Sequence, residues 1–104
     1  MNEGDQKMTV VRLIHVNVDP SQAAEVERIW NEDCAPLMLQ QTGCLSEQLL
    51  KCEDAPGEYI SYSEWESQAA IDAYRESEGH QQIQNHSRQL QGAKAVVKRY
   101  HVVS

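Results

Sequence analysis

Apolar residues recur along this chain with a period of two in some segments and of three to four in others. The first spacing is typical of strands and the second of amphipathic helices. We predict strands over residues 8–18, 44–52, 58–66 and 93–103. We predict helical segments over residues 21–42, 68–76 and 78–90.

The first helical segment should contain an internal break. Its apolar stripe consists of Ala23, Val26, Ile29, Trp30 and Leu37. Asp33 falls inside this stripe, and Pro36 cannot lie deep in a straight helix because it lacks an N–H and crowds the preceding turn. We therefore expect a kink or a restart near Asp33. Ser21 is the predicted N-cap, and the segment should end before Gly43.

Serine and glycine residues mark the remaining boundaries. Ser67 and Ser77 are the predicted N-caps of the two later helical segments. Gly92 is expected to end the last of them, whose inward stripe is formed by His80, Ile83, Ser87 and Leu90. Residues 53–57, EDAPG, have the composition of a turn, so the two strands around them should form a hairpin.

The element order β-α-β-β-α-β predicts an α+β fold of the ferredoxin-like class, with a four-stranded antiparallel sheet and the helices on one face. By the period of two, Ile14 and Val16 fall on one face of the first strand and Leu13 on the other. Tyr62 should join Leu13 there. An uncovered apolar sheet face is costly in water, so we expect a homodimer joined through the sheet faces.

Composition and charge limit the classes of partner that the protein is expected to bind. The 104 residues suffice for one domain, which we place at residues 8–104 after a disordered tail at 1–7. The net charge of −7, with scattered basic residues, opposes nucleic-acid binding. No apolar run is long enough to span a bilayer, and the polar start has no signal-peptide core. We therefore expect a cytoplasmic protein with no membrane partner.

Cysteine and histidine spacing favours neither a disulfide framework nor a metal site. The three cysteines are odd in number and none lies in a CxxC motif, so reduced thiols are expected. His15, His86 and His101 form no metal signature with a carboxylate. No glycine-rich phosphate loop, nucleophile elbow or pair of catalytic carboxylates is present. We predict no metal and no cofactor.

Several segments together resemble the antibiotic biosynthesis monooxygenase (ABM) domain of the dimeric α/β-barrel superfamily. They are VNVDPSQAAEVERIW, TGCLSEQLL, EYISYSEWESQAAIDAY and SEGHQQ, and the similarity extends over about residues 9–102. The most specific part is the EWES turn at residues 64–67, followed by an Ala-rich helix and then Ser77 and His80. The resemblance implies a homodimer with a ligand pocket between sheet and helices in each subunit. Activities in this family are mixed: some members oxygenate aromatic polyketides without metal or flavin, some oxidise quinols, some bind and degrade haem, and many have no known reaction.

Three residues are candidates for chemistry or binding. The resemblance implies that Trp65 lines the ligand cavity, although packing between helices and sheet would explain it equally well. His80 faces inward in the first turn of a helix, where the positive helix end favours a neutral base; the alternative is a structural histidine. Asp33 is either a catalytic carboxylate, since an apolar stripe is a costly place for one, or a helix cap.

Further residues are expected to contact the substrate. Tyr59, Ser61 and Ser63 share the strand face of Trp65 and supply hydroxyl groups. Some oxygenases of the family carry an Asn four residues before the Trp, a position that Ser61 holds here. The other predicted contacts are Trp30, Ile14 and Ile83.

The leading functional hypothesis is a cofactor-independent monooxygenase for a small electron-rich aromatic or quinol substrate. The alternative is a non-catalytic dimer of the same fold that binds a small hydrophobic ligand or serves regulation. An open pocket between Trp65 and His80 would favour the enzyme, and a filled core there the alternative. Haem degradation ranks lowest, because Ile14 and Gln84 hold the positions of the family's haem-site Asn and His. A small shift in the alignment with these family members would place Asn85 or His86 at the position of the haem-site His instead.

Overall fold

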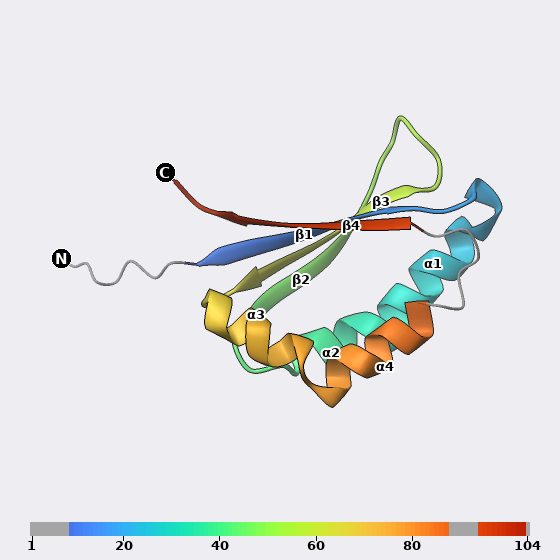
Figure 1. The fold of residues 1–104 in the computed structure, drawn as a ribbon. Coiled ribbons are helices and arrows are strands. Elements are labelled where there is room, and N and C mark those ends of the chain that lie inside the picture. Colours follow the sequence, from blue (N-terminus) through green and yellow to red (C-terminus); the bar gives the residue numbers. More distant parts are fainter. Residues whose placement is uncertain (1–8, 88–93, 104) are drawn as a thin grey trace.

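The computed structural model describes residues 9–87 and 94–103. These residues form a four-stranded antiparallel sheet with the α-helices on one face (Figure 1). The strands are β1 (Val10–Asn17), β2 (Cys44–Lys51), β3 (Glu58–Trp65) and β4 (Lys94–His101). The helices are η2 (Pro20–Gln22), α1 (Ala23–Ile29), η3 (Trp30–Cys34), α2 (Ala35–Leu39), α3 (Gln68–Arg75) and α4 (Glu78–Ser87). The predicted ferredoxin-like fold is confirmed.

The strand order is β2-β3-β1-β4, which makes β1 and β3 central and leaves β2 and β4 as edges. Leu13 of β1 pairs with Tyr62 of β3 on the sheet face that no described helix covers (Figure 1). Large apolar side chains are exposed on the same face, namely Leu50, Val96 and Tyr100. A second subunit over this face stays a prediction.

The predicted break in the first helical segment is confirmed, and it takes the form of the π-helical turn η3. Its end is marked by the N–H of Ala35, which donates to the carbonyl of Trp30 five residues earlier. Pro36 then occupies the first turn of α2, where its missing N–H costs nothing. The segment begins differently from the prediction, because Asp19 rather than Ser21 is the N-cap of η2. The Asp19 carboxylate accepts the backbone N–H of Ser21 at 2.9 Å.

The later helices begin where the sequence predicts. Ser67 Oγ accepts the N–H of Ala70 at 3.1 Å, and Ser77 Oγ accepts the N–H of His80 at 3.2 Å. Gly92 and Leu90 of the predicted last helix, and the predicted tail at residues 1–7, lie outside the described residues. Within the described part of the chain, no helix has the length and apolar character needed to cross a membrane.

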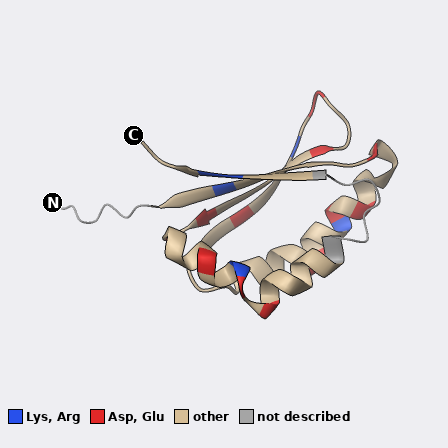
Figure 2. Cartoon of the chain, in the orientation of Figure 1, with Lys and Arg blue, Asp and Glu red and all other residues tan. Residues whose placement is uncertain are grey.

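Charged positions are distributed over both layers. Figure 2 shows acidic positions on the helices and on several strands, and basic positions on β1, β4 and the helices. The exposed Arg28 of α1 is surrounded by acidic neighbours on its own helical segment, with its Nη2 2.7 Å from Glu25.

The core is divided into two clusters. One contains Met38, Trp65, Ile71 and Tyr74, and the other contains Val18, Val26 and Tyr59. Three polar residues of the central strands are also buried, namely Arg12, Ser61 and Ser63. Buried polar groups need partners, so this middle part of the sheet is where a functional site is expected.

Candidate functional site

A cavity of about 540 Å³ lies between the sheet and the helices. The sheet contributes Arg12, Ile14, Val16, Leu49, Tyr59 and Ser61, and its edge strand β4 adds Ala95 and Val97. The helical side contributes Val26, Ile29, Trp30, Cys34, Tyr74 and His80, followed by Ile83 and Gln84. The volume lies in the range of small-molecule sites, and most of the wall is apolar. The cavity can therefore hold a small aromatic molecule.

The π-helical turn determines which side chains of the first helical segment reach this cavity. Trp30 and Cys34 stand at the two ends of η3 and both line the wall. Burial, together with the nearby Asp33, raises the pKa of the Cys34 thiol to about 11. The thiol is therefore protonated at neutral pH and supplies an apolar surface rather than a nucleophile.

Six of the nine predicted site residues line the cavity. They are Ile14, Trp30, Tyr59, Ser61, His80 and Ile83. The remaining three, Ser63, Trp65 and Asp33, are not part of its wall.

Trp65 lies behind the wall rather than in it. Its side chain is fully buried, and its indole N–H donates to Ser63 Oγ at 2.9 Å. The indole packs against the Tyr74 ring, with 5.1 Å between ring centres, and Tyr74 in turn lines the cavity. Tyr74 thus separates Trp65 from the cavity, which corrects the expectation that Trp65 forms the cavity surface. A role of Trp65 in substrate binding stays a prediction.

His80 is placed by the first turn of α4. Its ring meets the Tyr74 ring edge-on, with 4.9 Å between centres. Burial lowers the pKa of the imidazole, and the positive charges of Arg12 and Arg75 lower it further. The imidazole is therefore neutral at neutral pH and has a nitrogen that can accept a proton. The neutral state expected from the sequence thus rests on burial and neighbouring cations, rather than on the helix end.

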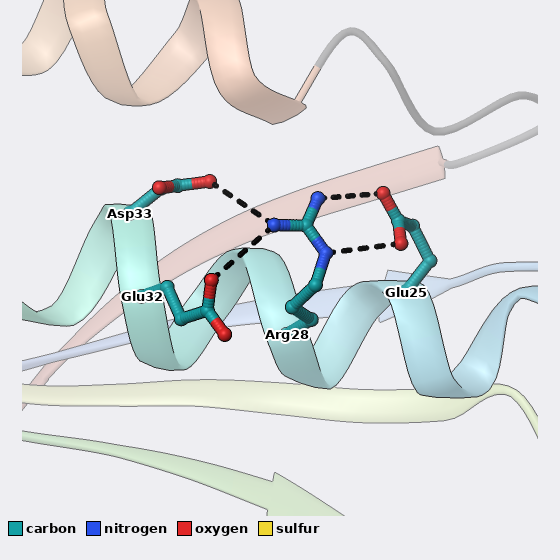
Figure 3. A network of polar contacts seen from close by, with 4 residues as sticks. All are labelled: Glu25, Arg28, Glu32 and Asp33. Carbon is teal, nitrogen blue, oxygen red and sulfur yellow. Dashed lines mark hydrogen bonds and ion pairs between the residues drawn. The ribbon is translucent and has the colours of Figure 1, made fainter.

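Asp33 lies in a polar network around Arg28. Its Oδ2 is 4.0 Å from Arg28 Nη1, and the same guanidinium bonds Glu25 and contacts Glu32 (Figure 3). The N-cap position of α2 is Cys34, so Asp33 does not occupy the capping position considered for it. A catalytic role for Asp33 stays a prediction, and the contact with Arg28 does not bring its carboxylate to the cavity.

Arg12 is the most unusual member of the wall, and the sequence analysis missed it. The residue is 5% exposed, and its guanidinium carbon lies 5.7 Å from the centre of the Tyr74 ring. Burial lowers the pKa of Arg12, but a guanidinium stays charged at any physiological pH. A signal was present, because Arg12 shares the period-two face of Ile14 and Val16.

Glu47 of β2 is the second residue that the sequence analysis missed. Its Oε2 accepts the hydroxyl of Ser61 at 3.1 Å, and its Oε1 is buried without a hydrogen-bond partner among the described residues. Burial raises the pKa of Glu47 to about 8, although the bond from Ser61 and the positive charge of Arg12 oppose this change. The carboxyl group is therefore largely protonated at neutral pH. Glu47 does not line the cavity itself, but its hydrogen-bond partner Ser61 does.

The site can bind a small ligand and move a proton within a largely neutral wall. Burial raises the pKa of Tyr74 and of Tyr59 to about 12, so both phenols are protonated at neutral pH. Among residues 9–87 and 94–103, no group of three His, Cys, Asp or Glu is arranged to hold a metal ion.

Comparison with known proteins gives the family. The model of the antibiotic biosynthesis monooxygenase family matches residues 9–86. The chain belongs to this family. No curated protein matches the chain by sequence.

Solved structures of similar shape include other proteins linked to the ABM family. A Bordetella bronchiseptica protein, provisionally assigned as an antibiotic biosynthesis monooxygenase, has a TM-score of 0.83 and 20% identity over 92% of this chain and 98% of its own. SnoaB, a cofactor-independent oxygenase from Streptomyces nogalater, has a TM-score of 0.79 and 18% identity over 93% and 95%. A Caulobacter crescentus protein with the same provisional assignment has a TM-score of 0.80 and 18% identity over 94% and 92%. At these identities the likeness shows the shared ABM fold, and the reaction has to be argued from the site.

Proposed function

We propose that this ABM-family protein is a cofactor-independent monooxygenase for a small electron-rich aromatic or quinol substrate. The observation that carries the proposal is His80, a neutral imidazole in the wall of a largely apolar cavity. The similarity to SnoaB, itself a cofactor-independent oxygenase, supports the choice of reaction. We further propose a homodimer joined through the uncovered sheet face and a cytoplasmic location, with which the free cysteines agree.

The proposed reaction needs one base and a site that excludes water. For a substrate that reacts at an aromatic-activated CH₂ group, His80 accepts one proton from the carbon, and the remaining electron pair delocalises into the ring system. This anion transfers one electron to O₂, and the two radicals combine into a peroxide anion with a new C–O bond. His80 then returns its proton to the terminal oxygen.

Loss of the second proton from the same carbon completes the reaction. Its electron pair forms the C=O bond as the O–O bond breaks, and the hydroxide that leaves takes up the proton as water. The sum is CH₂ + O₂ → C=O + H₂O, so the substrate supplies all the electrons. The apolar residues of the wall keep bulk water from the anion.

Oxygen uptake tests the proposal directly. A panel of anthrones and quinols is offered to the protein in chelator-treated buffer without flavin, and O₂ consumption is followed with an electrode. Loss of a general base costs about 10²–10⁴-fold, so we expect His80→Gln to lower kcat by about that factor. His101→Gln, the same exchange at an exposed residue at the end of β4, serves as the matched control. The proposal fails if His80→Gln reduces stability but leaves the oxygenation rate unchanged.

A non-catalytic ligand-binding dimer is the second candidate, and one observation favours it. Tyr74 contacts both Trp65 and His80, so the space between these two residues is filled by a ring. Tyr74 and His80 line the cavity, and Trp65 does not. Tight binding of the panel compounds without any O₂ uptake would identify this second function.

A further inference from the structure

We propose that the cavity selects aromatic ligands that carry a carboxylate, and that Arg12 is the residue that binds this group. The inference deepens the proposed function, on which it rests for the aromatic body of the ligand. It assigns a role to a residue that the oxygenation chemistry does not use.

Arg12 is a buried cation that forms no ion pair with any of the described residues. The residue is 5% exposed and lies in the cavity wall. Among the described residues, no carboxylate oxygen comes within ion-pair distance, 4.0 Å, of its guanidinium. A buried charge is costly unless it is paired, and the described residues offer Arg12 no ion pair. A ligand anion would supply the missing partner.

The groups around Arg12 do not supply that negative charge. Tyr74 offers the face of its ring at 5.7 Å, and its hydroxyl is also hydrogen-bonded to Arg12. Both are weaker interactions than an ion pair, because the phenol is neutral. Glu47 is the nearby acid. Burial raises the pKa of its carboxyl group to about 8, even though the bond from Ser61 and the positive charge of Arg12 oppose this change, so the group is largely protonated at neutral pH. Its Oε2 is moreover engaged by Ser61.

A second arginine strengthens the positive character of this part of the sheet. The register of β1 and β4 places Arg99 directly opposite Arg12, on the same sheet face. Like charges in directly opposed cross-strand positions destabilise a sheet. Arg99 is exposed and does not line the cavity, so it adds positive charge beside the site rather than in its wall. Basic positions on both strands are visible in Figure 2, in a protein whose net charge is −7.

The remaining wall defines the body of the ligand. Apolar side chains from the sheet and the helices surround the cavity beside Arg12, among them Ile14, Ile29 and Ile83. A planar guanidinium binds a carboxylate through two parallel hydrogen bonds, a geometry that a neutral amide cannot reproduce. A flat aromatic ligand with a carboxylate at one end therefore matches both the apolar wall and Arg12.

Two matched probes test the proposal apart from turnover. Anthraquinone-2-carboxylate and anthraquinone-2-carboxamide have the same ring system, which is already oxidised and does not consume O₂. Hydrogen bonds to a buried charged group are worth enough to give a preference of about 10- to 100-fold for the carboxylate, measured by calorimetry. Arg12→Gln should abolish the preference while changing carboxamide affinity less than about threefold.

Two further variants complete the experiment. Arg12→Lys keeps the charge but loses the planar two-bond geometry, so it should retain part of the preference. Arg28→Gln removes one positive charge from the outer face of α1, away from the cavity, and should leave the preference unchanged. Equal wild-type affinity for the two probes, or an undiminished preference in Arg12→Gln, overturns the proposal. The wild-type comparison decides even if Arg12→Gln does not fold, and a missing preference together with normal O₂ uptake would overturn this proposal alone.

Discussion

The buried carboxyl group of Glu47 predicts a specific dependence of protein stability on pH. The substitution Glu47→Gln keeps the shape of the side chain but removes its ionisation. Burial raises the pKa of Glu47 from 4.5 to about 8 in the folded protein. The unfolded chain exposes the same carboxyl group to water, where it ionises near the ordinary value. The folded state therefore holds a proton at pH values at which the unfolded state has lost it.

The sign of the effect follows from this difference in proton binding. The contribution of Glu47 to stability is fully present below pH 4.5 and is lost as the pH rises through about 8. Each pH unit in this interval lowers the free energy of unfolding by about 1.4 kcal/mol, which gives an upper bound of about 4–5 kcal/mol. Relaxation and water penetration reduce such penalties, so we expect about 2–4 kcal/mol.

Urea denaturation at pH 5, 7 and 9 measures this contribution. The two tryptophans, Trp30 and Trp65, provide the fluorescence signal, and the protein concentration is held fixed because an oligomer would make stability depend on it. Subtracting the curve of Glu47→Gln removes the contribution of all other titrating groups. Glu53→Gln, the same exchange at an exposed position between β2 and β3, is the control.

The decisive quantity is the difference between wild type and Glu47→Gln as a function of pH. We expect the variant to gain stability relative to wild type from pH 5 to pH 9, while the difference for Glu53→Gln stays constant. A constant difference for Glu47→Gln as well would show that Glu47 ionises freely in the folded protein. This result would refute the placement of the Glu47 carboxyl group in a buried position beside Ser61.

Three further predictions concern packing, assembly and haem. Trp65→Ala should lower the free energy of unfolding by about 3–5 kcal/mol, because it removes a fully buried indole; chemical denaturation would contradict this with a loss below 1 kcal/mol. Light scattering at micromolar concentration should give the mass of a dimer, since Leu13 and Tyr62 lie on an uncovered sheet face, and a monomer mass would contradict the proposed assembly. A haem titration should give no saturable Soret band, because Ile14 and Gln84 hold the positions of the family's haem-site Asn and His; one-to-one saturation at low micromolar protein would show the opposite.

The fold was readable from the sequence because its signals are local and agree with one another. The caps at Ser67 and Ser77 and the break before Pro36 each arise from hydrogen-bonding capacity within a few residues. Ser21 was misassigned as a cap because Asp19, two residues earlier, accepts both its N–H and its hydroxyl. Two capping residues so close together cannot be ranked from sequence alone.

The polar part of the site was harder to predict, and Glu47 shows why. A β-bulge interrupts the pairing of β2 with β3 between Cys44 and Ser46, so one residue is added to β2 without a partner. After this insertion the inward positions change from even to odd numbers. Counting by twos from Cys44 places Glu47 on the outer face, whereas the structure places it against Ser61. The insertion depends on pairing with another strand, which the local sequence does not reveal.

The relation between Trp65 and His80 depends in the same way on a third residue. The sequence predicts that both face one cavity between the sheet and the later helices, but Tyr74 from α3 packs between them. Because Tyr74 also faces Arg12, one ring contacts the buried indole, the neutral imidazole and the guanidinium. The position of Tyr74 therefore couples the packing of the core to the geometry of the cavity wall. A change at Trp65 should alter ligand binding through Tyr74, even though Trp65 does not reach the cavity.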